Sequence, residues 1–158
     1  MDFAGAEAIY RDGLNSVKGD GSVRTISGFA SRDDRNPALQ DYYGTPTPLD
    51  EFVTSALQGT GDFEGESDAV RRQGIQKGIQ NQVMVAWTIH ELGSALSKAA
   101  DGNFDAAGGA PHNWDEAWAF YHGADGGCGP FGTGNKRAGN FGTVAADGET
   151  AQANEAIL

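Results

Sequence analysis

Cysteine, basic residues and long apolar runs are all scarce in this chain of 158 residues. Its one cysteine, Cys128, excludes an intrachain disulfide and a cluster of thiolate metal ligands. Lysine and arginine total 11 against 22 aspartate and glutamate residues, a net charge of −11 that argues against nucleic acids and anionic membrane surfaces as partners. Because no apolar run exceeds a few residues, we expect no insertion into a membrane. Soluble cations are the natural complement of so acidic a surface.

Glycine, by contrast, is abundant, with 24 residues, which is about twice its usual share. This excess predicts long loops, which we place at residues 23–47, 59–66 and 123–142. Between the loops, the spacing of apolar residues and the placing of capping residues predict helices. We expect them over residues 3–16, about 50–57, 68–100, 113–122 and 148–158.

The helix over residues 68–100 is the clearest of these because no proline interrupts it. Over residues 83–92 its apolar side chains lie on nearly all sides, which is typical of a central, buried helix. No segment shows the alternation of a strand. The sequence therefore predicts an all-α fold: one domain over residues 1–158, a helical bundle around one long central helix, with long glycine-rich ordered loops.

The dipeptide His90-Glu91 lies inside that apolar run. Counting by helical steps places His90 on the core-facing stripe with Ala86 and Val83, and Glu91 about 100° further round. A buried carboxylate needs a cation, a hydrogen-bond network or protonation. Two interpretations stay open: a core histidine satisfied by a neighbour, with Glu91 on a partly solvated edge, or a metal or catalytic role.

The second candidate constellation is the aromatic segment that ends at His122. Asn113 is predicted to cap this helix, with Glu116 as its capping-box partner. Asp115 shares a face with His122, and carboxylates in a first turn also interact favourably with the helix dipole, so a purely structural role stays open. The three histidines, at positions 90, 112 and 122, nevertheless fall on or beside two helices that we expect to pack together. Imidazole with carboxylate is a ligand set for iron, manganese or zinc.

Known catalytic metal motifs do not fit these helices. A di-iron bundle needs Glu-x-x-His repeats, but Trp87 stands three residues before His90, and Ala119 stands where a histidine would follow Glu116. A zinc protease motif fails as well, because Ser94 stands where its second histidine is required. Ferritin-like oxidase chemistry is therefore disfavoured, and enzymatic activity would require a metal site with an open coordination position.

Four segments together resemble the low-iron-inducible periplasmic protein family, the algal iron-assimilation family that also includes high-CO2-inducible secreted proteins. They are IQKGIQ at 75–80, TIHEL at 88–92, HNWDEAWAFY at 112–121 and KRAGNFG at 136–142. The pattern IYxxGxNS at 9–16 is similar to the beginning of the same unit. The resemblance spans nearly the whole chain, and the segment over residues 113–121 is its most specific part.

The resemblance implies an extracellular or periplasmic protein that binds iron, as Fe2+ or Fe3+, or another divalent metal, and assists iron uptake without catalysis. Met1–Gly5 shows no signal peptide, so we expect a mature or trimmed segment, and such units also occur in tandem in this family. A partner protein in uptake, or self-association, is a further expectation. The ligands we expect lie in the segments that carry the resemblance or directly follow them: His90, Glu91, Asp115, Glu116, Tyr121 and His122.

Two other functions stay open. The glycine-rich loops are also compatible with a structural or interaction module without a metal, such as a coat or filament subunit. A bicarbonate or anion binder is the third hypothesis, prompted by the high-CO2-inducible members of the family. Its basic residues would be Arg71-Arg72 and Lys136-Arg137.

Overall fold

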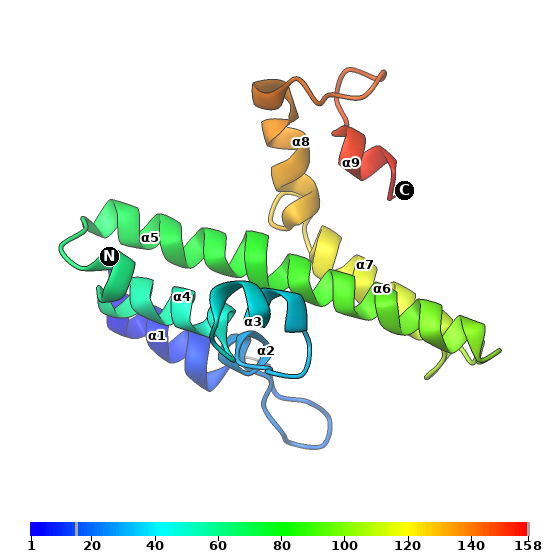
Figure 1. Ribbon diagram of the computed structural model, residues 1–158, viewed down its shortest axis with the longest axis horizontal. Coiled ribbons are helices and arrows are strands. Elements are labelled where there is room, and N and C mark those ends of the chain that lie inside the picture. Colours follow the sequence, from blue (N-terminus) through cyan, green and yellow to red (C-terminus); the bar gives the residue numbers. More distant parts are fainter. Residues whose placement is uncertain (15, 158) are drawn as a thin grey trace. The chain divides into compact units, whose positions relative to one another are not determined.

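A computed structural model describes residues 1–14 and 16–157 of the chain (Figure 1). Within these ranges the regular structure is helical, and the β-type pairing is confined to two isolated bridges, Val17 with Val23 and Val144 with Ala151. The predicted all-α fold is confirmed. The chain divides into two compact units, residues 1–83 and 84–158, and each is described by itself below. The prediction of one domain stays a prediction.

Over its described residues, 1–14 and 16–83, the first unit contains five α-helices, a short 3-10 turn and a π-helical segment. They are α1 (Phe3–Asp12), α2 (Ile26–Ala30), α3 (Pro37–Tyr43), α4 (Pro48–Gln58), η1 (Gly61–Phe63), α5 (Asp68–Lys77) and η2 (Gly78–Val83). α1 ends earlier than predicted, because Gly13 takes up a left-handed conformation with φ +63° and caps the helix. The expectation of an irregular segment over residues 23–47 was wrong, since α2 and α3 form there.

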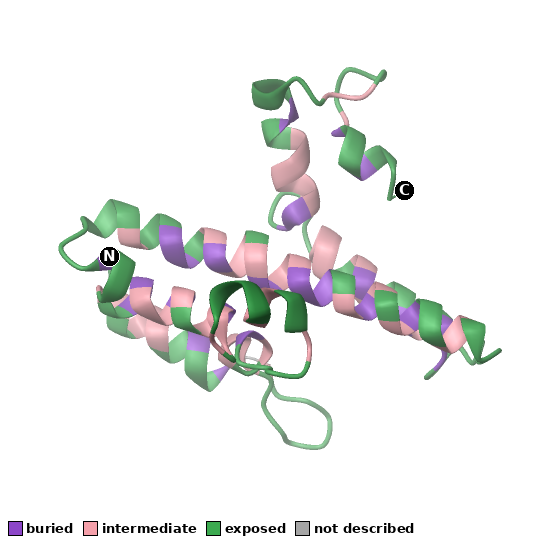
Figure 2. Ribbon diagram, viewed as in Figure 1, coloured by how far each residue is buried: buried purple, intermediate pink, exposed green. Residues whose placement is uncertain are grey.

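The core of this unit lies between α4 and the helices packed on it, α1 and α5. α4 buries an apolar stripe at helical spacing (Figure 2): Leu49, Val53, Ala56 and Leu57. α5 comes close to this core at Gly74, where an added Cβ would overlap the ring of Phe63. The sequence places glycine at this position of the helix because the neighbouring ring leaves no room for a side chain.

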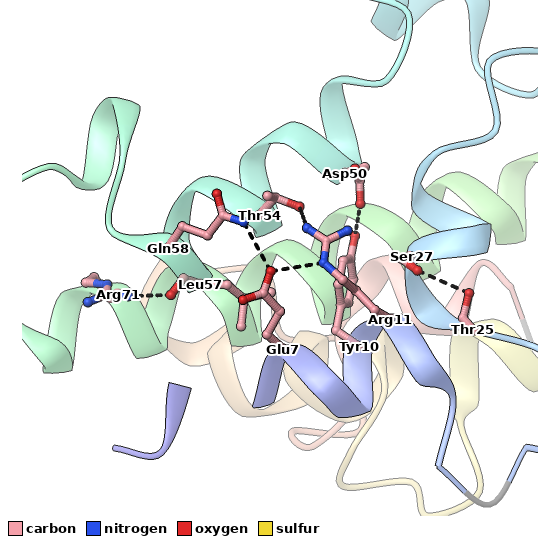
Figure 3. Close-up of polar contacts among 10 residues, drawn as sticks. All are labelled: Glu7, Tyr10, Arg11, Thr25, Ser27, Asp50, Thr54, Leu57, Gln58 and Arg71. Atoms are coloured by element: carbon pink, nitrogen blue, oxygen red, sulfur yellow. Dashed lines mark hydrogen bonds and ion pairs between the residues drawn. The ribbon is translucent and has the colours of Figure 1, made fainter. Parts of the chain in front are cut away.

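Arg71 of α5 holds the C-terminal end of α4. Its Nε donates a hydrogen bond to the carbonyl oxygen of Ala56 at 3.0 Å. Its Nη2 donates to the carbonyl oxygen of Leu57, the bond drawn in Figure 3. The last carbonyls of a helix have no partner inside the helix, so these bonds satisfy two of them. The guanidinium carbon also lies 3.8 Å from the ring centroid of Phe3, a cation–π contact.

α1 is joined to α4 by a cluster of polar side chains (Figure 3). The hydroxyl of Tyr10, a side chain that is only 1% exposed, donates a hydrogen bond of 2.7 Å to Asp50. Beside it, Arg11 donates to Glu7 at 3.0 Å and to Thr54 at 3.3 Å. Burial and the hydrogen bond to Asp50 raise the pKa of Tyr10 far above its ordinary value. These contacts fix the position of α1 along α4.

The second unit consists of α6 (Met84–Ala100), α7 (Ala110–His122), α8 (Pro130–Phe141) and α9 (Gln152–Glu155). The backbone stays helical from Asp68 through η2 to Ala100, so the predicted long helix is confirmed. The prediction that residues 83–92 are buried on nearly all sides was wrong, because Ile89 is 63% exposed. α6 instead buries one side against α7.

Three other boundaries differ from the predictions. α7 begins at Ala110 with a proline in its first turn, so Asn113 lies inside the helix and is not its cap. The predicted loop over residues 123–142 contains α8, which begins at Pro130 in the same way. The predicted helix over residues 148–158 shortens to α9. The helix ends predicted before the loops at 59–66 and 123–142 are confirmed, because Gly59 and Gly123 directly follow α4 and α7.

A matched pair of glycines tests this packing. We expect Gly74→Ala to destabilise the protein by about 1–3 kcal/mol, because its new Cβ meets the Phe63 ring. Gly93→Ala lies in the middle of α6, where the new methyl group would have nothing within 4 Å. This change is expected to stabilise the protein by up to about 1 kcal/mol. Urea unfolding followed by circular dichroism measures both, and equal signs for the two changes would contradict the packing described.

A second prediction concerns Tyr10 at high pH. Its pKa is raised in the folded state, so above about pH 10 the unfolded chain loses this proton while the folded chain keeps it. The free energy of unfolding should then fall by about 1.4 kcal/mol for each pH unit from this residue alone. Tyr10→Phe should remove that part of the slope between about pH 10 and about pH 11.5 in urea titrations. An unchanged slope in Tyr10→Phe would contradict this assignment.

Candidate functional site

α6 and α7 form an antiparallel pair whose interface contains charged and polar side chains. Glu91 of α6 is 6% exposed and Asn113 of α7 is 7% exposed. Asn113 Nδ2 donates a hydrogen bond of 2.5 Å to Glu91 Oε2. Lys98 Nζ donates to Asn113 Oδ1 at 2.6 Å and to the carbonyl oxygen of Gly108 at 2.8 Å. One amide therefore links a buried carboxylate to an ammonium group, which reduces the cost of burying Glu91.

The first interpretation from sequence placed His90 in the core and Glu91 on a partly solvated edge. The structure shows the reverse. Glu91 is buried and hydrogen-bonded, whereas His90 is half-buried at the edge of α6. The His90 ring lies edge-on to Trp87, with 5.4 Å between ring centroids. Adjacent helix positions differ by about 100°, so the two side chains diverge, and the imidazole does not join the network of Asn113.

The structure does bring together an imidazole and a carboxylate on α7. His112 Nε2 lies 3.5 Å from Glu116 Oε2, one helical turn away, with the two side chains 43% and 35% exposed. Asp115, the third acidic candidate, is exposed next to Glu116. His112 was not among the expected ligands, although the sequence placed it on or beside the aromatic helix. A start at Ala110, signalled by Pro111, puts His112 and Glu116 on one face.

His122 and Tyr121 are held in contacts of other kinds. The ring of His122 stacks on Trp118 at 5.0 Å and contacts Phe131 at 5.3 Å, and its Nδ1 lies 3.0 Å from the carbonyl oxygen of Gly123. The Tyr121 hydroxyl donates a hydrogen bond of 2.6 Å to Asn154. Burial raises the pKa of Tyr121, which disfavours the phenolate that Fe3+ would require.

Asn154 of α9 is the centre of a second amide network. It is fully buried, and its Nδ2 donates to the carbonyl oxygen of Phe131 at 2.8 Å and to Asn135 Oδ1 at 2.6 Å. Asn135 Oδ1 also accepts a hydrogen bond of 2.8 Å from the backbone of Ala151. Together with Tyr121, this side chain joins α7, α8 and α9 without any charged group.

No three histidine, cysteine, aspartate or glutamate side chains gather into a metal-binding group within residues 1–14 and 16–157. The six expected ligands therefore do not form one cluster there. The four basic residues of the anion hypothesis are divided between the two units. Arg71 donates to the carbonyls of α4 in the first unit, whereas Lys136 and Arg137 are exposed on α8 of the second.

A model of the low iron-inducible periplasmic protein family matches residues 1–151 of the chain. The chain belongs to this family. The predicted resemblance is thereby confirmed over almost its whole length. No curated protein and no solved structure matches the chain significantly. Over the described residues, none of the helices is both long and apolar enough to cross a membrane.

A third prediction concerns the Asn113 side chain, which is hydrogen-bonded to both Glu91 and Lys98. Asn113→Ala removes both hydrogen bonds and leaves the buried carboxylate without this donor, so we expect a loss of about 1–3 kcal/mol in the free energy of unfolding. Glu91→Leu removes the carboxylate itself. In a chain with this change, Asn113→Ala should therefore lower the free energy of unfolding by less. A double-mutant cycle by urea unfolding measures the difference, and additive losses would contradict the coupling.

Proposed function

We propose that this chain binds iron as a cargo ion in the periplasmic or extracellular space and assists its uptake without catalysis. The observation that carries the proposal is the pair His112 and Glu116, whose donor atoms lie 3.5 Å apart on α7 in a chain of the low iron-inducible periplasmic family. The family description supports the compartment and the link with iron. The metal, its ligands and the part played in uptake are our proposal.

The spacing of the two donors fits a single ion. Metal–nitrogen and metal–oxygen bonds of about 2.1 Å put two donor atoms about 3.0–3.4 Å apart for angles between about 90° and the tetrahedral value. The His112 and Glu116 atoms, 3.5 Å apart, need only a small adjustment to reach this range. Both side chains are half-exposed, so an ion from solution can reach them. An imidazole nitrogen together with a carboxylate oxygen suits Fe2+.

Two protein donors leave the remaining coordination positions to water. Such a site exchanges its ion readily, which suits a protein that passes iron on. The net charge of −11 adds a general attraction for cations. Glu91 and Tyr121 are left out of the proposed site because each is engaged by an asparagine.

Equilibrium dialysis against Fe2+ under anaerobic conditions, followed by elemental analysis, tests this site. We expect about one iron per chain, and binding roughly tenfold weaker or more in His112→Ala and in Glu116→Gln, because each change removes one donor. Glu149→Gln removes the same charge from an exposed loop of the same unit and should bind as the unchanged chain does. Circular dichroism checks that every variant folds.

Two outcomes would overturn the proposal. Iron binding unaffected in His112→Ala but lost in His90→Ala or His122→Ala would move the site to other histidines. If Glu149→Gln weakened iron binding as much as Glu116→Gln, the effect of Glu116 would come from net charge and not from direct binding of the ion.

A further inference from the structure

The second unit has an apolar groove beside the pair α6–α7, with a volume of about 250 Å³. α6 contributes Thr88, Leu92 and Leu96 to its lining, and α7 contributes Trp114, Trp118 and Tyr121, with the residues after α9 completing it. Leu96 is 69% exposed and Trp114 is 56% exposed, so large apolar side chains face solvent at the groove. Exposed apolar surface of this kind marks binding sites.

The chemistry of the lining limits what the groove can hold. None of the described residues that line it carries a charge. A charged ligand would lose its hydration there without gaining an opposite charge, so the groove selects neutral molecules. Two indole rings and one phenol ring favour a flat aromatic occupant, which stacks or packs edge-on against them.

The two hydroxyl groups of the lining add a hydrogen-bonding preference. Thr88 donates its proton to the carbonyl oxygen of Met84 at 2.9 Å, and Tyr121 donates its proton to Asn154 at 2.6 Å. Because a hydroxyl has one proton and two lone pairs, both groups are left as acceptors. An occupant with an O–H or N–H group therefore suits them better than one that only accepts.

We propose that this groove binds one neutral, planar aromatic molecule that carries an O–H or N–H group. Its volume lies just below the roughly 300–1,000 Å³ of typical ligand pockets, which limits the occupant to about two or three rings. The groove is separate from the proposed iron site. Trp114 follows His112 by two residues, and Trp118 follows Glu116 by two residues. Two residues correspond to about 200° around α7, so the tryptophans and the iron ligands lie on different faces.

Fluorescence titration with N-phenyl-1-naphthylamine tests the proposal, because this probe is neutral, has three aromatic rings and carries one N–H group. We expect saturable binding of about one probe per chain. The matched probe 8-anilino-1-naphthalenesulfonate has the same rings and N–H group with an added negative charge. We expect it to bind at least about tenfold more weakly, because the sulfonate meets no cation in the groove.

Matched variants test whether the probe binds in this groove. Leu96→Gln and Trp114→Gln change exposed side chains of the lining, and each should weaken binding about fivefold or more. Ile89→Gln makes a similar change at another exposed position of α6, outside the lining, and should leave binding unchanged. All three variants should retain iron as the unchanged chain does, so a failure here is distinguishable from a failure of the iron site.

Three results would overturn the inference: equal affinity for the sulfonated probe, equal weakening in Ile89→Gln, or no binding of the neutral probe. Gel filtration accompanies the titration. A dimer that Leu96→Gln converts to a monomer, with no probe bound, would assign the groove to contact between two copies of the chain.

Discussion

The second unit depends on how a carboxylate is accommodated between two helices. Glu91 is buried where α6 meets α7, and its hydrogen bond from Asn113 requires that residue to face α6. Lys98 engages the same amide from the next turns of α6, which fixes α7 along its partner. Because Asn113 faces α6, the helical repeat determines the direction of the other side chains of α7. His112 and Glu116 come to one side of the interface, and the two tryptophans come to the other.

The fold was predictable where the sequence follows local rules. The absence of proline over residues 68–100 and the glycines at 59 and 123 indicated the long helix and two helix ends. α8 was missed because its glycines argue against a helix locally. Tertiary packing explains two of them: a Cβ at Gly132 would overlap the carbonyl oxygen of Gly126, and one at Gly134 would lie 3.3 Å from the amide of Asn154. Contacts between distant segments are not visible in local propensity.

For the candidate site, the sequence indicated imidazole and carboxylate ligands from two packed helices, and this stays a prediction. The structure brings one such pair together on a single helix, because the start of α7 at Ala110 puts His112 and Glu116 on one face. The apolar run around His90 gave no sign of which neighbour would be buried. Glu91 is the buried neighbour because it accepts a hydrogen bond from Asn113, which lies on another helix. The periodicity of α6 alone therefore cannot predict its burial.

The attachment of the last helix has a consequence for the behaviour of the protein in different salt solutions. α9 is held through Asn154, Asn135 and Tyr121, all of them uncharged. A chain with a net charge of −11 repels itself more strongly as ionic strength falls, because screening weakens. Ion pairs at the surface change in strength under the same conditions, but bonds between amides and a phenol do not. The hydrogen bonds that hold α9 therefore depend little on ionic strength.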